Sequence, residues 1–91
     1  MVSKEVLVRN KTGLHLRPAT ELSAVCSQCP CNVTIVCEKG NINPKSVLML
    51  MAAGIKAGTK ITVQCDGEQE QESLDKIIAA IEGGFGEEMV C

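Results

Sequence analysis

The apolar residues of this 91-residue chain change their spacing several times between the two-residue period of a strand and the three-to-four-residue period of a helix. This spacing predicts strands at 3–9, 32–38 and 60–66, a short fourth strand at Ile42, and helices at 16–28, 47–53 and from the acidic stretch 68–72 to Gly83. The order β-α-β-β-α-β-α is typical of a two-layer α+β fold, in which helices cover one face of a four-stranded antiparallel sheet.

Residues that share a face within each element predict the hydrophobic core. The expected inward residues are Val6, Val8, Val33, Ile35, Cys37, Ile61, Val63 and Cys65 on the strands, and Ala19, Leu22, Cys26, Cys29, Leu74, Ile77, Ile78 and Ile81 on the helices. With no Trp or Tyr and a single Phe, the core must consist of aliphatic side chains and cysteine. We expect one domain over residues 1–91.

Charge and composition argue against several classes of partner. The net charge is −2 and no dense basic run is present, so the electrostatic signature of a nucleic-acid-binding protein is missing. The near absence of aromatic side chains also disfavours base stacking, and with it an RNA-binding module. No apolar run approaches the ~18 residues that span a bilayer, and the N-terminal residues lack the pattern of a signal peptide. We therefore expect a cytoplasmic protein with no membrane insertion.

Cysteine is unusually frequent, at positions Cys26, Cys29, Cys31, Cys37, Cys65 and Cys91. In a reducing compartment most of these residues are expected to serve as small core side chains. The spacing Cys26-x-x-Cys29-x-Cys31 leaves open a zinc or iron–sulfur site, although a fourth ligand would have to come from elsewhere. We expect no metal site, inert thiols at Cys37 and Cys65, and the most exposed thiol at Cys91.

The stretch from Gly13 to Thr20 contains the only histidine of the chain, His15. A helical pattern starts directly after it, and Pro18 suits a first helical turn because its missing N–H is no loss there. A helix N-terminus binds anions through free backbone amides, and the guanidinium of Arg17 offers a planar set of donors to phosphate. A neutral imidazole is nucleophilic near neutral pH. The stretch therefore predicts an anion site with a group able to carry a phosphoryl moiety.

A second helix start follows the turn Asn43-Pro44-Lys45, where Ser46 has the side chain preferred at an N-cap. The helix after it is apolar almost all round. Either it is deeply buried or part of it is a contact surface, and Val47, Leu48 and Met51 fit both interpretations.

Three separated stretches resemble the HPr family, the histidine-containing phosphocarriers of the bacterial phosphotransferase system for sugar uptake. They are Lys11-Thr-Gly-Leu-His-Leu-Arg-Pro-Ala-Thr20, Asn43-Pro-Lys-Ser-Val-Leu-Met-Leu-Met51 and Ile81-Glu-Gly-Gly-Phe-Gly-Glu87. The resemblance implies an open-faced β-sandwich and a protein substrate in a relay rather than a turnover enzyme, with no cofactor. It also implies that His15 accepts a phosphoryl group at Nδ1 from Enzyme I, with phosphoenolpyruvate as the first donor, and passes it to the IIA domains of sugar permeases, with Arg17 stabilising the phosphate.

The middle stretch resembles the branch of the family in which a serine kinase/phosphorylase modifies the residue corresponding to Ser46. The phosphoserine form in that branch slows sugar uptake and is a corepressor for a catabolite-control transcription factor. We expect partner contacts from Leu16, Thr20, Val47, Leu48 and Met51. Leu16 departs from the family, where Ala is usual, and the high cysteine content is not a family trait.

Two alternatives remain open. The chain could be a regulatory paralogue that uses the same histidine chemistry without serving sugar transport. A thiol metalloprotein built on Cys26, Cys29 and Cys31 belongs to a different class of function, and metal analysis under reducing conditions would decide it.

Overall fold

A computed structural model describes residues 1–9 and 13–86 of the chain. The elements are β1 (Val2–Leu7), α1 (Leu16–Ser27), β2 (Asn32–Cys37), β3 (Gly40–Ile42), α2 (Val47–Ala52), β4 (Lys60–Asp66), α3 (Glu70–Glu82) and a 3-10 turn η1 (Gly84–Gly86). Their order confirms the predicted β-α-β-β-α-β-α arrangement, with boundaries within two residues of those expected.

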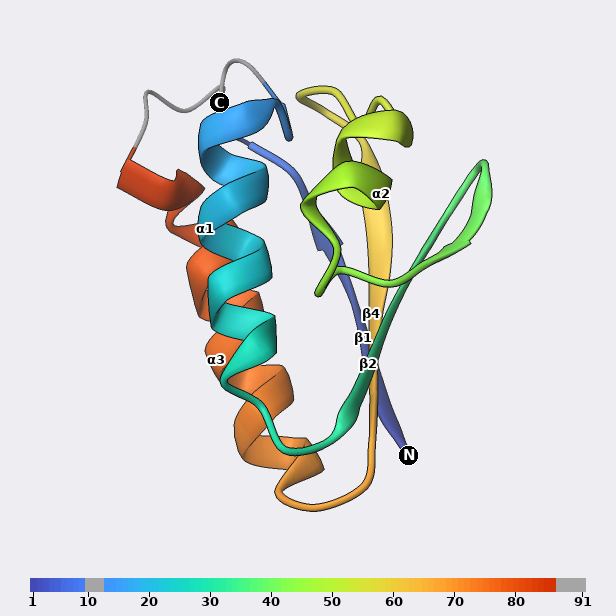
Figure 1. The fold of residues 1–91 in the computed structure, drawn as a ribbon, viewed down its shortest axis with the longest axis vertical. Helices are drawn as coiled ribbons and strands as arrows, with labels where there is room; N and C mark the ends of the chain where they lie inside the picture. Colours follow the sequence, from blue (N-terminus) through green and yellow to red (C-terminus); the bar gives the residue numbers. More distant parts are fainter. Residues whose placement is uncertain (10–12, 87–91) are drawn as a thin grey trace.

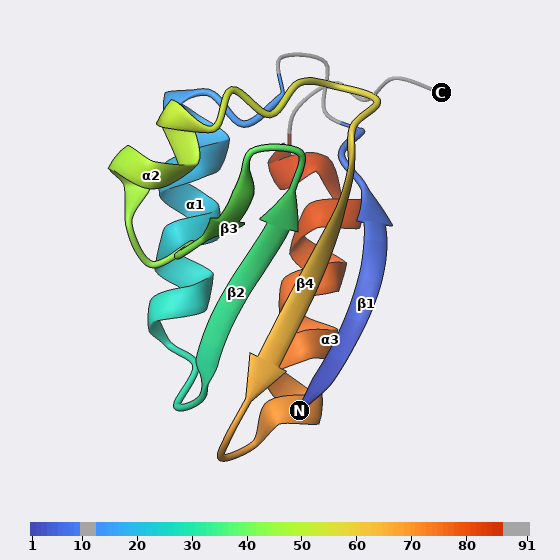
Figure 2. The ribbon, with the colours of Figure 1, turned by 90° about the vertical axis from the view of Figure 1, so that its right-hand side faces the viewer.

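The strands form one antiparallel sheet in the order β1-β4-β2-β3. Figures 1 and 2 show α1 and α3 side by side on one face of this sheet, while its other face is open. The short helix α2 lies beside α1 at the edge that carries β3 (Figure 2). The two-layer α+β fold with helices on one face of the sheet is therefore as the sequence predicted.

Alternation along the central strand places its apolar side chains in the core. Ile61, Val63 and Cys65 on β4 are buried, while the residues between them face the open side of the sheet. The helical stripe Leu74, Ile77, Ile78 and Ile81 of α3 is buried against the same face. The expected inward residues are all buried except Cys37.

Two expectations about individual positions need correction. Cys37 is only half-buried, because it is the last residue of β2, lies opposite Gly40 at the hairpin end and lines a surface depression with Lys39 and Ala53. The first strand ends at Leu7 rather than Arg9, since Val8 leaves the ladder and its backbone pairs with Gly58 and Thr59 instead.

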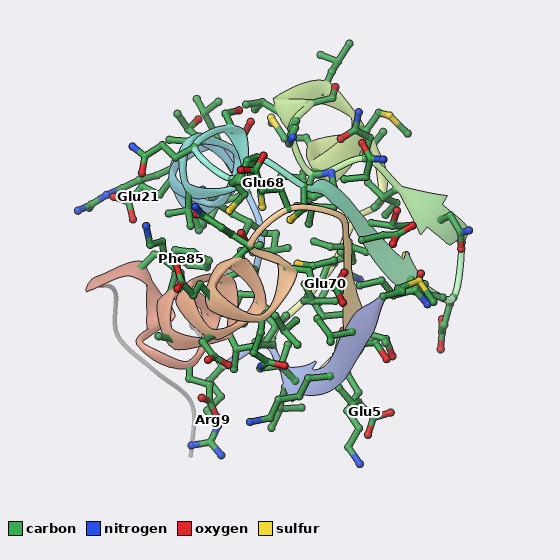
Figure 3. All side chains as sticks on the ribbon, turned by 90° about the horizontal axis from the view of Figure 1, so that it is seen from below. Glu5, Arg9, Glu21, Glu68, Glu70 and Phe85 are labelled. Carbon is green, nitrogen blue, oxygen red and sulfur yellow. The ribbon has the colours of Figure 1, made fainter. Side chains whose placement is uncertain are left out.

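Within residues 1–9 and 13–86, the acidic side chains are exposed or half-buried, and Figure 3 shows Glu5 and Glu21 pointing outward. Glu70, at the start of α3, accepts a hydrogen bond from the Gly67 N–H at 3.2 Å. It also forms an ion pair with the Met1 ammonium, at an N–O distance of 3.1 Å. The Gly67 hydrogen bond is the largest cause that lowers the pKa of Glu70.

Among the described residues, no helix is both long enough and apolar enough to cross a membrane.

Candidate functional site

His15 is the N-cap residue of α1 and is exposed. Its backbone is extended, with φ −80° and ψ −168°, and its carbonyl accepts the first helical hydrogen bond from Ala19 N–H at 2.9 Å. The amides of Leu16 and Arg17 lie in the first turn, where no carbonyl of the same helix can accept from them. Pro18 occupies the third helical position, where no N–H is needed. His15 therefore lies at the N-terminal end of a 12-residue helix, which is the positive end of the helix dipole.

The loop before His15 is fixed to a segment far away in the sequence. Leu14 N–H donates to the Ile55 carbonyl at 2.9 Å. Gly13 has φ +67°, and a Cβ added there would lie 2.5 Å from Ile55 O and 2.8 Å from Lys56 Cα. Only glycine fits so close a backbone approach. This contact sets the direction from which the chain enters α1, and so where the imidazole is presented.

His15 lines a shallow depression of about 270 Å³ together with Leu14, Met51, Gly54, Ile55 and Lys56. The depression joins three segments: the loop before α1, the end of α2 and the connection to β4. The position of residues 55–56 beside the histidine was not predictable from the sequence, because the contact is between backbones and the residue types at 55 and 56 do not reveal it.

Three further expected residues lie on the exposed face of the first turns of α1. The Arg17 side chain is 68% exposed, and its Nε is 3.9 Å from Glu21 Oε1 one turn later. An exposed pair of this kind contributes about 0.3–0.5 kcal/mol, so the guanidinium is easily released to a phosphate. Thr20 donates a hydrogen bond from Oγ1 to the Leu16 carbonyl at 2.6 Å. The Leu16 side chain is 60% exposed.

Ser46 is the N-cap of α2, as its residue type predicted. Its Oγ accepts a hydrogen bond from Met49 N–H at 3.3 Å. The turn before it is held by Asn43, whose Oδ1 accepts from Lys45 N–H at 3.0 Å. The Lys45 carbonyl accepts from Ser23 Oγ at 2.9 Å, which ties this turn to α1. Ser46 is half-buried as a residue and lies at the start of a short helix that packs on α1.

Helix α2 is only partly buried. Some of its apolar residues belong to the core, and others are exposed and available as a contact surface. Leu50 is fully buried, and Val47 is half-buried against the core. Leu48, Met49 and Met51 are 80%, 43% and 42% exposed. We refer to Leu16, Leu48 and Met51 as the apolar surface, whereas Met49 lies on another side of α2 and lines a depression with residues of β2 and β3. The sequence did not single out Met49, because a helix that is apolar all round does not reveal which side faces the solvent.

The cysteines near the end of α1 lie in the interior. Cys26, Cys29, Cys31 and Cys65 are all buried and free, and Figure 3 shows sulfur atoms between α1 and the sheet. Burial raises the pKa of Cys26 and of Cys65 to about 12, with smaller contributions from neighbouring thiols. In residues 1–9 and 13–86, no three His, Cys, Asp or Glu side chains are grouped as metal ligands. Cys91 lies outside the described residues.

The raised pKa of Cys26 predicts a loss of stability at alkaline pH. The thiol stays protonated in the folded protein up to about pH 12, whereas in the unfolded chain it ionises from its ordinary value of 9.0. Its contribution is complete below pH 9.0 and is lost as the pH rises towards about 12, because the unfolded state then binds fewer protons. The unfolding free energy of the wild type falls with rising pH in this range. We expect the slope of that fall to be smaller in Cys26→Ala by about 1.4 kcal/mol per pH unit.

Urea unfolding at several pH values above 9.0 measures this slope. Cys37→Ala is the matched control, since it removes a half-buried thiol. An unchanged slope in Cys26→Ala would show that this thiol ionises equally in both states.

Comparison with known proteins identifies relatives that match the chain over most of its length. The family described as "PTS HPr component phosphorylation site" matches residues 2–83. The chain is 36% identical over 77 residues to the phosphocarrier protein HPr of Mycoplasma capricolum, covering 85% of this chain and 86% of the relative. It is 35% identical to the HPr-like protein Crh of Bacillus subtilis, covering 90% and 96%. The crystal structure of HPr from Thermoanaerobacter tengcongensis matches with a TM-score of 0.92 at 30% identity, covering 97% and 99% of the two chains.

Proposed function

Because the chain belongs to the HPr family of phosphocarrier proteins, we propose that it accepts a phosphoryl group on His15 from phosphorylated Enzyme I and passes it to the IIA domains of sugar permeases. Phosphoenolpyruvate is the first donor of this proposed relay, which runs in the cytoplasm. The observation that carries the proposal is the exposed imidazole of His15 at the N-terminus of α1.

The proposed transfer is a displacement at phosphorus. The lone pair of the neutral His15 Nδ1 forms the new N–P bond while the bond between phosphorus and the donor atom breaks, and that electron pair returns to the donor. The reverse displacement on a IIA domain regenerates the neutral imidazole. Charge neutralisation matters more than covalent chemistry in such a step. The amides of Leu16 and Arg17 and the guanidinium of Arg17 are placed to supply it.

The apolar surface is the proposed docking site for these partners. Leu16 lies next to His15 in sequence, and Met51 shares the depression with the imidazole. A protein that docks there covers the phosphoryl group and excludes water. Methionine suits a surface that must accept several partners, because its side chain is flexible and polarisable. Within the expected contact set, Thr20 adds a polar group, while Val47 contributes less because it is half-buried.

Ser46 is the proposed regulatory site, modified by a serine kinase/phosphorylase, with the phosphorylated form recognised by a catabolite-control transcription factor. Ser46 already caps α2, and a phosphate there adds about two negative charges beside the apolar surface. Docking of an acidic partner such as Enzyme I would weaken by repulsion.

Ser46→Ala is expected to abolish ATP-dependent labelling by the cognate kinase and to leave histidine labelling intact. It should also cost about 1 kcal/mol of stability, because the hydrogen bond from Met49 N–H is lost. Ser46→Asn is the matched control, since it keeps an N-cap acceptor but has no hydroxyl. Acid-stable serine labelling that persists in both variants would place the regulatory site elsewhere.

A regulatory paralogue is the second candidate function, because the Crh relatives match the chain about as well as the HPr of Mycoplasma capricolum does. Sugar phosphorylation separates the two candidates. The protein is added to phosphoenolpyruvate, Enzyme I, a sugar-specific IIA domain and the cognate permease. Sugar phosphate that appears only when the protein is present supports the phosphocarrier. Labelling of His15 without sugar phosphate, across a panel of IIA domains, supports the regulatory paralogue.

A further inference from the structure

Backbone contacts, rather than its own side chain, place Lys56 beside His15. Its Cα is 2.8 Å from where a Gly13 Cβ would be, and its neighbour Ile55 accepts the Leu14 hydrogen bond. On the other side, the Lys56 carbonyl accepts from Thr59 N–H at 3.2 Å, which closes a turn that is itself bonded to Val8. The backbone of Lys56 is therefore held from both directions.

The ammonium of Lys56 is available for an anion. The residue is exposed and lines the same depression as His15. The ion pairs within the described part of the chain use the Met1 ammonium, Arg17 and Lys60 as cations, and none of them includes Lys56. Arg17, two residues after His15 in sequence, already has Glu21 beside it.

We propose that Lys56 is a second cationic contact of the phosphoryl group carried by His15, which it reaches across the depression that the two residues share. This inference rests on the proposed phosphocarrier function and adds a residue to its site. A phosphoryl group on the imidazole brings about two negative charges to a place where only Arg17 and the first-turn amides of α1 were expected to meet them. The flexible four-carbon stem of lysine lets the ammonium follow the phosphoryl group without moving the fixed backbone.

The contact exists only when the phosphoryl group is present, so it favours the phosphorylated form over the free protein. It should also favour the doubly ionised phosphoryl group over the singly ionised one. A single positive charge at about 5–6 Å in water lowers the pKa of that second ionisation by about half a unit at low ionic strength.

Phosphorus NMR titration of the phosphorylated protein tests this directly. Potassium phosphoramidate serves as the donor, because it phosphorylates imidazoles without a protein partner: its P–N bond breaks, ammonia leaves and the N–P bond to His15 forms. We expect Lys56→Ala to raise the second phosphoryl pKa by about half a unit. Lys56→Arg should keep the wild-type value, and Lys76→Ala, which removes an exposed lysine on α3, should leave it unchanged.

Equal titrations of wild type and Lys56→Ala would overturn the inference, and so would a shift no larger than that of Lys76→Ala. If Lys56→Ala raises only the KM for phosphorylated Enzyme I, the lysine serves carboxylates of the partner and the inference is again wrong. Urea midpoints close to wild type establish that the variants are folded. Absence of transfer from Enzyme I to the wild type would contradict the proposed function instead, and the phosphoramidate titration is independent of that result.

Discussion

His15→Ala is expected to lose all phosphoenolpyruvate-dependent labelling in the presence of Enzyme I. The imidazole is the proposed acceptor, and alanine has no atom that can form the N–P bond. The side chain is exposed and the residue lies at a helix end, so the fold should survive the change. Labelling with radioactive phosphoenolpyruvate, followed by separation at neutral pH, measures the loss.

His15→Asn is the control for structure, because asparagine is a preferred N-cap residue and should support the start of α1 at least as well as histidine. It should also remain unlabelled. An acid-labile adduct on either variant would mean that another residue accepts the phosphoryl group. Matching circular dichroism spectra for wild type and both variants would remove misfolding as the cause of the loss.

Gly13→Ala is expected to destabilise the protein by about 2–5 kcal/mol and to impair transfer as well. A non-glycine residue in the left-handed region costs about 1–2 kcal/mol. The added Cβ would lie 2.5 Å from Ile55 O, so the two backbones must separate and the 2.9 Å hydrogen bond of Leu14 is lost. Leaving a buried donor unpaired costs a further ~1–3 kcal/mol. Urea unfolding gives the first effect, and labelling of the fraction that remains folded gives the second.

Gly54→Ala separates the cost of the left-handed backbone from the cost of the lost contact with Ile55 and Lys56. Gly54 has φ +63°, close to that of Gly13, but the nearest atom to an added Cβ is the flexible end of Lys39 at 3.7 Å. It should show the backbone cost alone. Equal destabilisation by the two substitutions would mean that the contact with Ile55 and Lys56 does not hold the loop before His15.

Features that depend only on residues close together in the chain were predictable from the sequence. The alternation of Ile61, Val63 and Cys65 places them in the core whichever strands flank β4. Ser46 caps α2 because its own hydroxyl accepts from an amide three residues later. Pro18 lies in the first turn of α1, as its missing N–H predicted.

Features that depend on contacts between distant segments were not predictable. The depression beside His15 exists because Gly13 and Leu14 meet Ile55 and Lys56, more than 40 residues away. Neither the spacing nor the residue types of 55–56 reveal this pairing. The exposure of Met49 likewise depends on which side of α2 packs on α1.

Residue-resolved mass spectrometry of the wild-type protein in a pulse and chase tests the central claim most directly. Phosphoenolpyruvate and Enzyme I supply the pulse, and a sugar-specific IIA domain supplies the chase, with peptides separated at neutral pH. We expect one phosphoryl group on the peptide that contains His15 after the pulse, and its transfer to the IIA domain during the chase. A phosphoryl group on any other residue, or one that stays on His15 with every IIA domain tried, would contradict the proposed phosphocarrier role.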